Sequence, residues 1–529
     1  MNNKSRYDVI IIGSGMGALT VGGLLAKAKG KKVLILEQHS TPGGYTHNFK
    51  RAGGYVFNTG IHYIGALADI EQKVFNYLTE NKVPLQPLPD PQETFVYPDI
   101  KIMVPSDWEK YRDMLIQLFP EEKKNIAGYF KDIKNGRKWV EYFIIRQTLP
   151  SGLRFLFRLI RNKYQKLVLQ TTQHYLDLKF KNPLLKSILS SRWIDYGLPP
   201  GKSAFAIHSL IENHYMSGAS FPAQGTSSLC NAIQSLIKAA GGATKCRHKV
   251  TKILVHDGMA IGVRFKTDDS VQEQDVYAPV IVSDAGAKNT YETLLQNQCS
   301  DTLYDTRSVK TGTSVVQLCI GLSQPPQSVG SKGEIAWIYN THDHERIFDG
   351  ADVLDGNPQF CFLNFPLANK DTDDVSRKYT AEIISPVNYR YFEKWKDGNR
   401  KENGSEYQQL KDTITQGLIN LVEKQYPGFK NIITFSELST PLTSEQYTLH
   451  PFGAIYGVPA TPERFRMPFV SNTTPVKNLY LTGADAGMPG IVGVMMSGLA
   501  TAAMVAGPFG LIDIMGCVMS GRSRTNRSI

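Results

Sequence analysis

The sequence predicts an α/β fold with a buried parallel sheet, on the evidence of three segments near its start. Tyr7 to Ile12 and Lys32 to Leu36 are short apolar runs, each long enough for one strand. Between them, apolar residues at helical spacing follow a glycine-rich turn at residues 13–18. Runs without polar alternation are typical of central parallel strands, which are buried on both faces. The order strand, helix, strand therefore indicates the first unit of a parallel sheet covered by helices.

The turn between the first strand and the helix has the pattern G-x-G-x-x-G/A. Its positions are Gly13, Gly15 and Ala18, and Gly17 is an additional glycine. The first glycine permits a tight turn, the second lets a pyrophosphate approach the backbone, and the small third residue lets the helix pack closely on the strand. Glu37 ends the second strand, where its carboxylate can accept hydrogen bonds from a ribose diol. In this context the motif predicts a dinucleotide site rather than a glycine-rich turn without a ligand.

A Gly-Gly pair and a second glycine-rich segment follow Glu37. The pair lies in Thr41-Pro42-Gly43-Gly44-Tyr45, and the segment from Gly53 to Gly65 ends in Thr-Gly-Ile-His-Tyr-Ile-Gly. In these residues the chain resembles the FAD-dependent polyene oxidoreductases, which include phytoene desaturases and carotenoid isomerases, and it looks most like their retinol saturase branch. Tyr45 and Asn58 depart from the family pattern, where Arg and Asp are common. The resemblance implies FAD as the cofactor, in a discontinuous, glutathione-reductase-like FAD-binding domain of Rossmann type.

Further matches to the family lie in the middle and near the end of the chain. Val250 is in a hairpin whose matching valine contacts adenine through its backbone, and Asp284 stands where the family has Asn. Near the end, Gly483-Ala484-Asp485 and the loop at 489–493 match the part that meets the ribityl chain and the flavin. Asp485 also suits a helix N-cap, which is the alternative interpretation. The resemblance implies the following FAD-binding residues: Gly13, Gly15, Gly17, Ala18, Glu37, Gly43, Gly44, Val250, Gly483, Asp485, Gly490, Val492 and Gly493.

These matches divide the chain into an interrupted cofactor domain and an α+β substrate domain. No second strand–GxGxxG–helix unit is visible, so a dedicated nicotinamide domain is not expected, although NAD(P)H can still act as a transient electron donor at the flavin. The predicted cofactor domain comprises residues 1–100, 205–295 and 466–515. The predicted substrate domain comprises a helical part at 101–204 and a sheet at 296–465, and residues 516–529 are predicted to form a basic, disordered tail.

The basic excess of the chain is concentrated in one insert. The 529 residues carry a formal net charge of +11. Residues 142–176 contain no Asp or Glu, and Arg154, Arg158 and Arg161 recur at the spacing of one helix face. A basic helix with aromatic and aliphatic neighbours suits the surface of an anionic membrane, and the alternative is an ordinary surface helix. Nucleic acid is not expected as a partner, because no binding module for it is recognisable.

Cysteine spacing and hydropathy restrict the compartment. None of the six cysteines forms a Cys-x-x-Cys pair, so no metal site is predicted, and scattered thiols suit a reducing compartment. The first residues lack the pattern of a signal peptide. Residues 486–512 carry no charge, but their prolines and glycines favour a buried loop and helix over a membrane-spanning helix. We therefore expect a cytoplasmic protein that associates peripherally with membranes.

The predicted function is saturation of a carbon–carbon double bond in a retinoid-like or carotenoid-like polyene. His62 is the candidate proton donor because its matching segment lies near the flavin and a histidine can donate near neutral pH; a purely structural His62 is the alternative. Tyr63 and Tyr456 are weaker candidates. Two other functions stay open: cis–trans isomerisation or desaturation on the same scaffold, and a non-catalytic module that binds isoprenoid or lipid. The sequence does not indicate an oligomeric state.

Overall fold

A five-stranded parallel sheet forms one end of the protein. The computed structural model describes residues 6–148, 163–296, 306–307, 309, 312–366, 378–396 and 404–523. The strand order in this sheet is β10-β2-β1-β14-β20, and every neighbouring pair is parallel. The strands are β10 (Ala243–Lys245), β2 (Val33–Leu36), β1 (Val9–Ile12), β14 (Val280–Ser283) and β20 (Leu479–Leu481).

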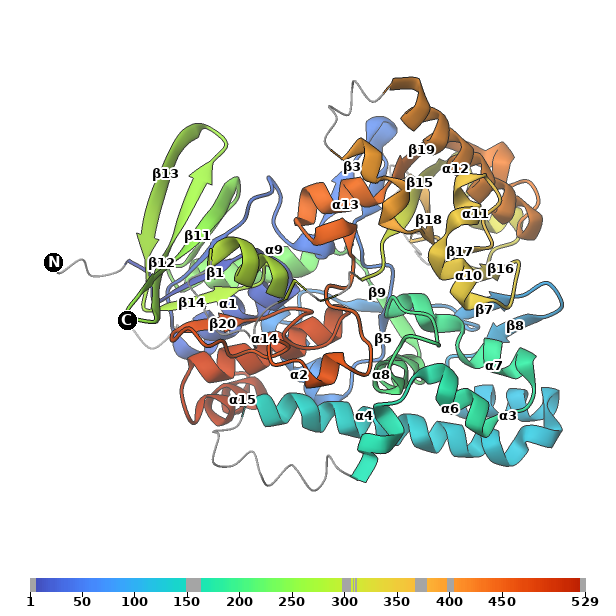
Figure 1. Cartoon of the computed structure of the whole chain (residues 1–529), viewed down its shortest axis with the longest axis horizontal. Coiled ribbons are helices and arrows are strands. Elements are labelled where there is room, and N and C mark those ends of the chain that lie inside the picture. The colour runs from blue at the N-terminus through green and yellow to red at the C-terminus, as the bar shows by residue number, and fades with distance from the viewer. Residues whose placement is uncertain are drawn as a thin grey trace.

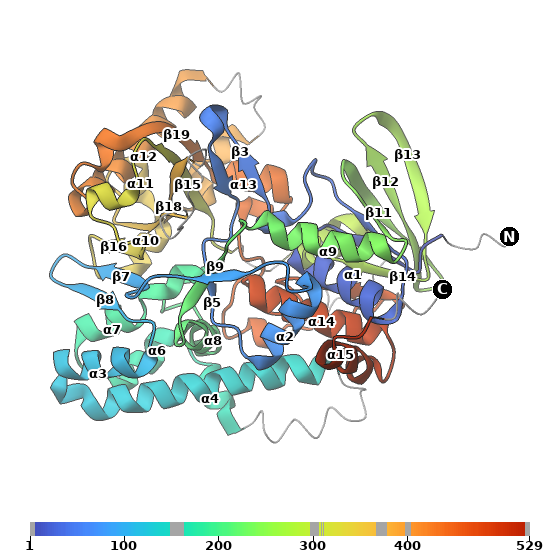
Figure 2. The same ribbon diagram turned by 180° about the vertical axis from the view of Figure 1, so that it is seen from behind.

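Alternate residues of β1 and β2 face two different cores, as expected for strands that are buried on both sides. Val9, Ile11 and Val33 pack against helices, whereas Ile10 and Leu34 pack against an antiparallel sheet. The helical side holds α1, α9, α14, α15 and α2, which lie in front in the view from behind (Figure 2). Their bounds are α1 (Met16–Lys29), α9 (Ser227–Ala239), α14 (Ile491–Val505), α15 (Gly510–Ser520) and α2 (Asp69–Thr79).

The opposite side of the parallel sheet carries a three-stranded antiparallel sheet, which stands apart at one edge of the molecule (Figure 1). Its strands are β11 (His248–His256), β12 (Met259–Thr267) and β13 (Ser270–Tyr277). Asp257 and Gly258 form the turn between the first two strands, and both have positive φ. Val250, Ile253 and Val263 from this sheet complete the second core.

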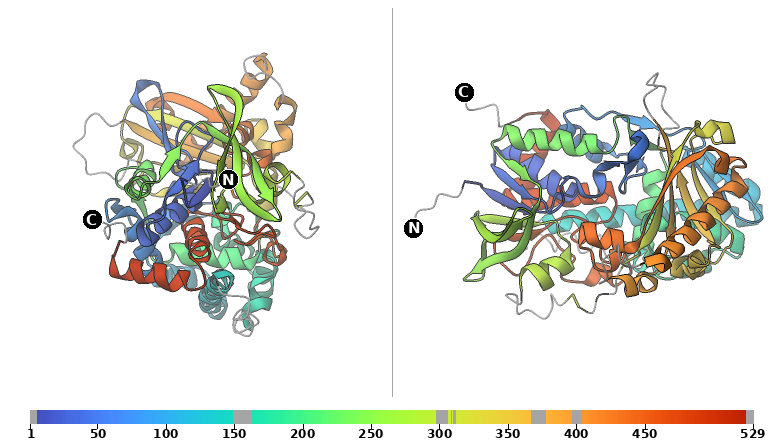
Figure 3. Two further views of the ribbon diagram at one scale, coloured as in Figure 1. Left: turned by 90° about the vertical axis from the view of Figure 1, so that its left-hand side faces the viewer. Right: turned by 90° about the horizontal axis from the view of Figure 1, so that it is seen from above.

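A seven-stranded sheet forms the other end of the molecule (Figure 3). Its order is β19-β15-β18-β17-β16-β7-β8, and all neighbours are antiparallel except β16 and β7. The strands are β19 (Ile433–Ser439), β15 (Val315–Leu322), β18 (Tyr379–Pro386), β17 (Phe360–Asn364), β16 (Ile335–Tyr339), β7 (Glu93–Val96) and β8 (Lys101–Val104). One face packs on α12 (Gly404–Gln425), and the other packs on a helical layer.

The helical layer connects the two ends. Its longest member, α4 (Lys123–Thr148), runs along one side of the molecule from α14 to α3 (Trp108–Leu118) (Figure 1). Along its length α4 packs on α8 (Phe205–Tyr215). The 3-10 turn at Ser191–Asp195 lies beside α8 and presents the last residue of the turn to the interior. Two small sheets, β3-β4 (Asn48–Lys50, Val56–Asn58) and β5-β9-β6 (Ile64–Gly65, Ala219–Pro222, Leu85–Pro87), lie between the ends.

The observed fold confirms the predicted α/β class and corrects the predicted tail. The uncharged stretch forms a loop followed by α14 and α15, and no helix among the described residues is long and apolar enough to cross a membrane. Helix α15 continues to Ser520, so a disordered tail from 516 is wrong for its first residues. Ile514 and Val518 hold this helix, because both pack into the core beneath α1. Phe509 and Ile512 are exposed, so the uncharged stretch is only partly buried.

The predicted basic insert is described only in part. Residues 142–148 continue α4, and Phe143 is buried in the core of the helical layer. Arg154, Arg158 and Arg161 lie outside the described residues. The domain boundaries drawn from the sequence remain a prediction, and α8, which they assign to the cofactor domain, packs on α4 of the helical layer.

Candidate active site

A cavity of about 1060 Å³ extends from the carboxyl ends of the parallel strands to the seven-stranded sheet. Ligands of open α/β sheets bind at these strand ends, so its position is the expected one. Most of the predicted site residues line it: Gly13, Gly15, Gly17, Glu37, Gly44, His62, Val250, Gly483, Asp485 and Gly490. The remaining four, Ala18, Gly43, Val492 and Gly493, are not part of the cavity wall.

Glycines at the start of α1 leave room for a ligand and for neighbouring backbone. Gly13 has φ +88°, a conformation that favours glycine. A Cβ on Gly17 would lie 2.7 Å from the backbone N of Gly483, and a Cβ on Gly44 would lie 3.1 Å from Cα of Gly15. Three segments therefore meet at backbone contact, which explains why residues 17 and 44 are glycine.

The carboxylate of Glu37 is fixed at the end of β2. It accepts hydrogen bonds from N of Ser14 at 3.0 Å, from Oγ of Ser14 at 2.6 Å and from N of His39 at 2.8 Å. The residue is 8% exposed and borders the cavity. A carboxylate has about four acceptor positions, so Glu37 can take a further hydroxyl from a ribose.

Asp485 joins two loops beneath the cavity. Its Oδ1 accepts from N of Val458 and its Oδ2 accepts from N of Ala287, both at 2.7 Å. The alternative interpretation of Asp485 as a helix N-cap is wrong, because the N-cap of α14 is Gly490. Gly490 has φ +83° and lies on the cavity wall with Ile491.

The N-terminus of α1 already holds a carboxyl group of the chain itself. The backbone N–H of Ala18 donates to Oδ2 of Asp284 at 3.2 Å. The free N–H groups and the partial positive charge of a helix N-terminus suit a phosphate in the same way. The donors and the glycine-lined space at this helix therefore fit the pyrophosphate of a dinucleotide.

The far end of the cavity is mainly apolar and carries titratable groups, among them His62 and Asp195. Its wall includes His62, whose Nδ1 lies 2.7 Å from Oε2 of Glu382, a fully buried residue. It also includes Asp195, whose Oδ2 accepts a hydrogen bond from Oη of Tyr63 at 2.6 Å. Burial raises the pKa of Asp195 to about 8, and the Glu93 carboxylate adds to that shift. Asp195 is therefore mostly protonated at neutral pH.

The comparisons with known proteins agree with this geometry. A family model described as an NAD(P)-binding Rossmann-like domain matches residues 11–80. The chain is 32% identical over 525 residues to the all-trans-retinol 13,14-reductase of Danio rerio, covering 94% of this chain and 86% of that protein. The chain belongs to the all-trans-retinol 13,14-reductase family. The Homo sapiens protein of the same name is 29% identical over 520 residues, covering 93% of this chain and 84% of that protein.

The chain also resembles more distant curated proteins and several solved structures. A chloroplastic prolycopene isomerase of an Oncidium hybrid is 24% identical, covering 97% of this chain and 86% of that protein. The crystal structure of cyclohexylamine oxidase from Brevibacterium oxydans matches with a TM-score of 0.62 at 13% identity, covering 97% of this chain and 99% of that one. An oxidoreductase from Methanosarcina mazei matches with a TM-score of 0.58 at 15% identity, covering 96% and 100%. The structural likenesses confirm the mixed α/β fold with a Rossmann-like parallel sheet.

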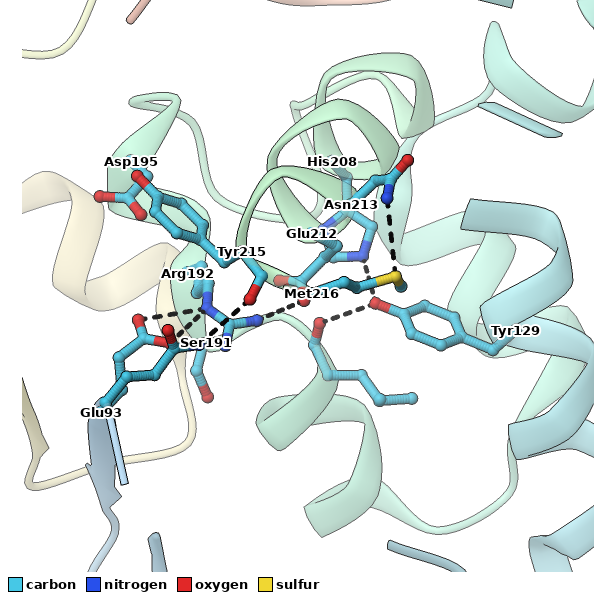
Figure 4. Close-up of polar contacts among 12 residues, drawn as sticks. Glu93, Tyr129, Ser191, Arg192, Asp195, His208, Glu212, Asn213, Tyr215 and Met216 are labelled. Carbon is cyan, nitrogen blue, oxygen red and sulfur yellow. Dashed lines mark hydrogen bonds and ion pairs between the residues drawn. The ribbon is translucent and has the colours of Figure 1, made fainter. Parts of the chain in front are cut away.

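A buried ionic cluster lies near the apolar end of the cavity, beside Asp195. Nη2 of Arg192 lies 2.6 Å from Oε2 of Glu93, and its Nη1 lies 2.5 Å from Oε2 of Glu212 (Figure 4). Asp195 is near this cluster, and the cluster's two carboxylates act against its ionisation, whereas Arg192 favours it. Nothing in the sequence indicated Asp195 or this cluster. For Asp284, the one indication was that it stands where the family has Asn.

Proposed function

We propose that this chain is an FAD-dependent oxidoreductase that saturates a carbon–carbon double bond of a retinoid-like polyene. The observation that carries the proposal is one cavity with a glycine-lined cradle at one end and an apolar wall with the carboxyl group of Asp195 at the other. Membership in the all-trans-retinol 13,14-reductase family supports the choice of reduction over the other reactions of the scaffold.

The chain's own residues assign a place to each part of FAD. The N-terminus of α1 with Gly13, Gly15 and Gly17 would hold the pyrophosphate, and Glu37 would hold the ribose. Val250 would meet the adenine, and Gly490 with its neighbours on α14 would face the flavin. When bound, FAD supplies the hydride for reduction of a double bond. NAD(P)H as the donor that reduces the flavin is part of the proposal and rests on the sequence alone.

The apolar wall beyond the cradle suits a polyene. Ile61, Ile194, Val315, Phe362 and Ile384 line this part of the cavity. Burial of a hydrocarbon chain against such side chains is favourable by about 25 cal/mol per Å² of apolar surface. A dry wall also excludes water from the reacting carbon atoms.

Asp195 is the proposed proton donor. Reduction of an alkene adds a hydride to one carbon and a proton to its neighbour, so the site needs an acid that holds its proton at neutral pH. Asp195 meets this requirement because burial raises its pKa to about 8. The hydrogen bond from Tyr63 fixes the orientation of the carboxyl group beside the cavity. His62 remains a predicted site residue; Glu382 orients its ring, and Phe362 packs beside it with ring centroids 5.5 Å apart.

Product analysis under anaerobic conditions tests the function. The purified protein with reduced flavin is incubated with all-trans-retinol, and the product mass is measured. A gain of two hydrogen atoms supports the reductase. An unchanged mass with a changed geometry supports an isomerase, which the prolycopene isomerase relatives favour as the second candidate. A loss of two hydrogen atoms supports a desaturase. Tight binding of the polyene without turnover supports a non-catalytic module. One relative from Danio rerio is named an inactive all-trans-retinol 13,14-reductase.

Replacing Glu37 with Ala is expected to weaken FAD retention by about 10- to 100-fold, because hydrogen bonds to a charged group contribute about 1.5–3 kcal/mol. Flavin content after gel filtration is the measurement. Glu37→Gln serves as the second variant, since its amide oxygen can still accept from Ser14. Glu273→Ala, an exposed site on β13, is the matched control. Unchanged flavin content in Glu37→Ala would refute the ribose role.

We also propose that the protein binds an anionic membrane surface, because residues 142–176 are basic and contain no Asp or Glu. Reversing the charge of Arg154, Arg158 and Arg161 is expected to weaken binding to anionic liposomes by at least about 100-fold, since each lost basic residue contributes about 1 kcal/mol at such a surface and the acidic replacements add repulsion. Sedimentation with liposomes measures the effect. Zwitterionic liposomes serve as the control. If the unmodified protein and the charge-reversed variant bind anionic liposomes equally, the proposal is contradicted.

A further inference from the structure

A carboxylate of the chain itself occupies the phosphate position at the start of α1. Asp284 is the residue that follows β14, and its Oδ2 accepts from the N–H of Ala18 at 3.2 Å. A Cβ on Gly15 would lie 2.5 Å from Oδ2, and a Cβ on Gly17 would lie 2.8 Å from Oδ1. A Cβ on Gly483 would overlap Oδ1 as well. The glycines that make room for a pyrophosphate thus also make room for this carboxylate.

The groups around Asp284 are mainly acidic. Glu37 from the end of β2 and Asp485 from the loop after β20 both act against its ionisation. The first turn of α1 contains no acidic side chain, so this helix offers only its backbone N–H groups. His450 also borders the cavity, and burial lowers its pKa, which favours the neutral ring. Arg464 lies behind Asp485 and donates to the carbonyl oxygens of residues 484 and 487.

Asp284 consequently titrates near neutral pH. Burial raises its pKa to about 7, and the two neighbouring carboxylates add to the shift, while the N–H groups of Ala18 and Gly15 oppose it. Below this pH the side chain is mostly neutral. Above it the side chain is an anion, which the partial positive charge of the helix N-terminus attracts.

We propose that Asp284 is a built-in competitor of the cofactor's pyrophosphate, so that the protein takes up a proton when it binds FAD. The inference rests on the proposed function only in that FAD is the ligand of the cradle. A pyrophosphate and an ionised Asp284 would share the same N–H donors, and two like charges at that distance repel. The ionised form must therefore be protonated or leave the cradle before the pyrophosphate can enter.

Binding of the pyrophosphate and protonation of Asp284 favour each other. The pyrophosphate adds negative charge beside Asp284, so binding raises the pKa of the carboxyl group further. By reciprocity, FAD binds more tightly where the carboxyl group is protonated, and its affinity falls as pH rises through 7. The alternative is a carboxylate that only caps α1, which predicts a stability effect without pH-dependent FAD binding.

The Kd of FAD is measured by equilibrium dialysis from pH 6 to pH 9, with protein from which bound flavin has been removed. For the unmodified protein we expect Kd to rise about tenfold from pH 6 to pH 8 and about tenfold again by pH 9, as one ionisation requires. Asp284→Asn keeps the shape of the side chain but cannot ionise, so its profile should be nearly flat and its Kd at pH 8 about tenfold lower. Calorimetry in two buffers of different ionisation enthalpy should show uptake of nearly one proton at pH 8, and none in the variant.

Asp257→Asn is the matched control, because Asp257 is an exposed turn residue with positive φ, which Asn also tolerates. Asp284→Ser and thermal unfolding curves separate a folding defect from a binding effect. A pH profile of Asp284→Asn that follows the unmodified protein, or weaker binding at pH 8, overturns the inference. A protein that binds FAD with a flat profile contradicts this inference alone, whereas a protein that binds no FAD at any pH contradicts the proposed function as well.

Discussion

Replacing Asp195 with Asn is expected to lower the rate of alkene reduction by about 10²- to 10⁴-fold while FAD content stays unchanged. This is the range that a positioned general acid contributes to a reaction. The side chain lies on the apolar end of the cavity wall and away from the glycine cradle, so its loss should not affect cofactor binding. Single-turnover oxidation of the reduced flavin by retinol, followed by absorbance, measures the effect.

The pH profile separates a proton donor from a residue that only shapes the cavity. Because burial raises the pKa of Asp195 to about 8, the protonated fraction falls as pH rises through that value, and the rate should fall with it. Tyr63→Phe removes a hydrogen bond that lowers this pKa, so the alkaline limb should move to higher pH.

Two further variants decide between the candidate acids. His62→Gln should retain the alkaline limb if Asp195 is the donor, and it should lose most of the rate if His62 is the donor. Asp177→Asn, at an exposed ion pair with Lys186, is the matched control. A full rate in Asp195→Asn with an unchanged pH profile would exclude Asp195.

Replacing Arg192 with Ala is expected to destabilise the protein by about 3–5 kcal/mol, because it leaves buried carboxylates without their cation. Arg192 is 3% exposed and contacts both Glu93 and Glu212. Glu93 also accepts from Nε1 of Trp337 at 3.0 Å, so the cluster connects the 3-10 turn at Ser191–Asp195 and α8 to the seven-stranded sheet. A fall in Tm of about 5 °C or more is the expected measurement.

A charge-free cluster provides the control for this prediction. The triple variant Glu93→Gln, Arg192→Met, Glu212→Gln removes the buried charges together while it keeps an acceptor for Trp337. It should recover much of the lost stability, since replacing a whole buried ion cluster by neutral residues is often neutral or favourable. If the triple variant is as unstable as Arg192→Ala, packing rather than charge accounts for the loss.

The cofactor half of the site could be predicted from the sequence because its signals are local. The strand at 9–12, the glycines at 13, 15 and 17, and Glu37 follow one another within one strand–helix–strand unit. Each residue's task follows from its own chemistry and from the element on which it lies. The family resemblance extended this prediction to the segment that follows β20. The prediction of a disordered tail from residue 516 was wrong because no local signal indicates the burial of Ile514 and Val518. These residues pack beneath α1, which is distant in the sequence.

The sequence by itself determined the fold class and the family, and it predicted the dinucleotide cradle, since periodicity and glycine spacing are properties of neighbouring residues. Only the tertiary structure decided which carboxyl groups hold protons. Asp284 reaches α1 across 266 positions of the chain, and His62 meets Glu382 across 320. The pKa of a carboxyl group depends on burial and on nearby charges, which the folded chain brings together from distant segments. In the sequence alone, Asp195 and Asp284 look like ordinary acids, and only the fold supports the roles proposed for them as proton donor and phosphate competitor.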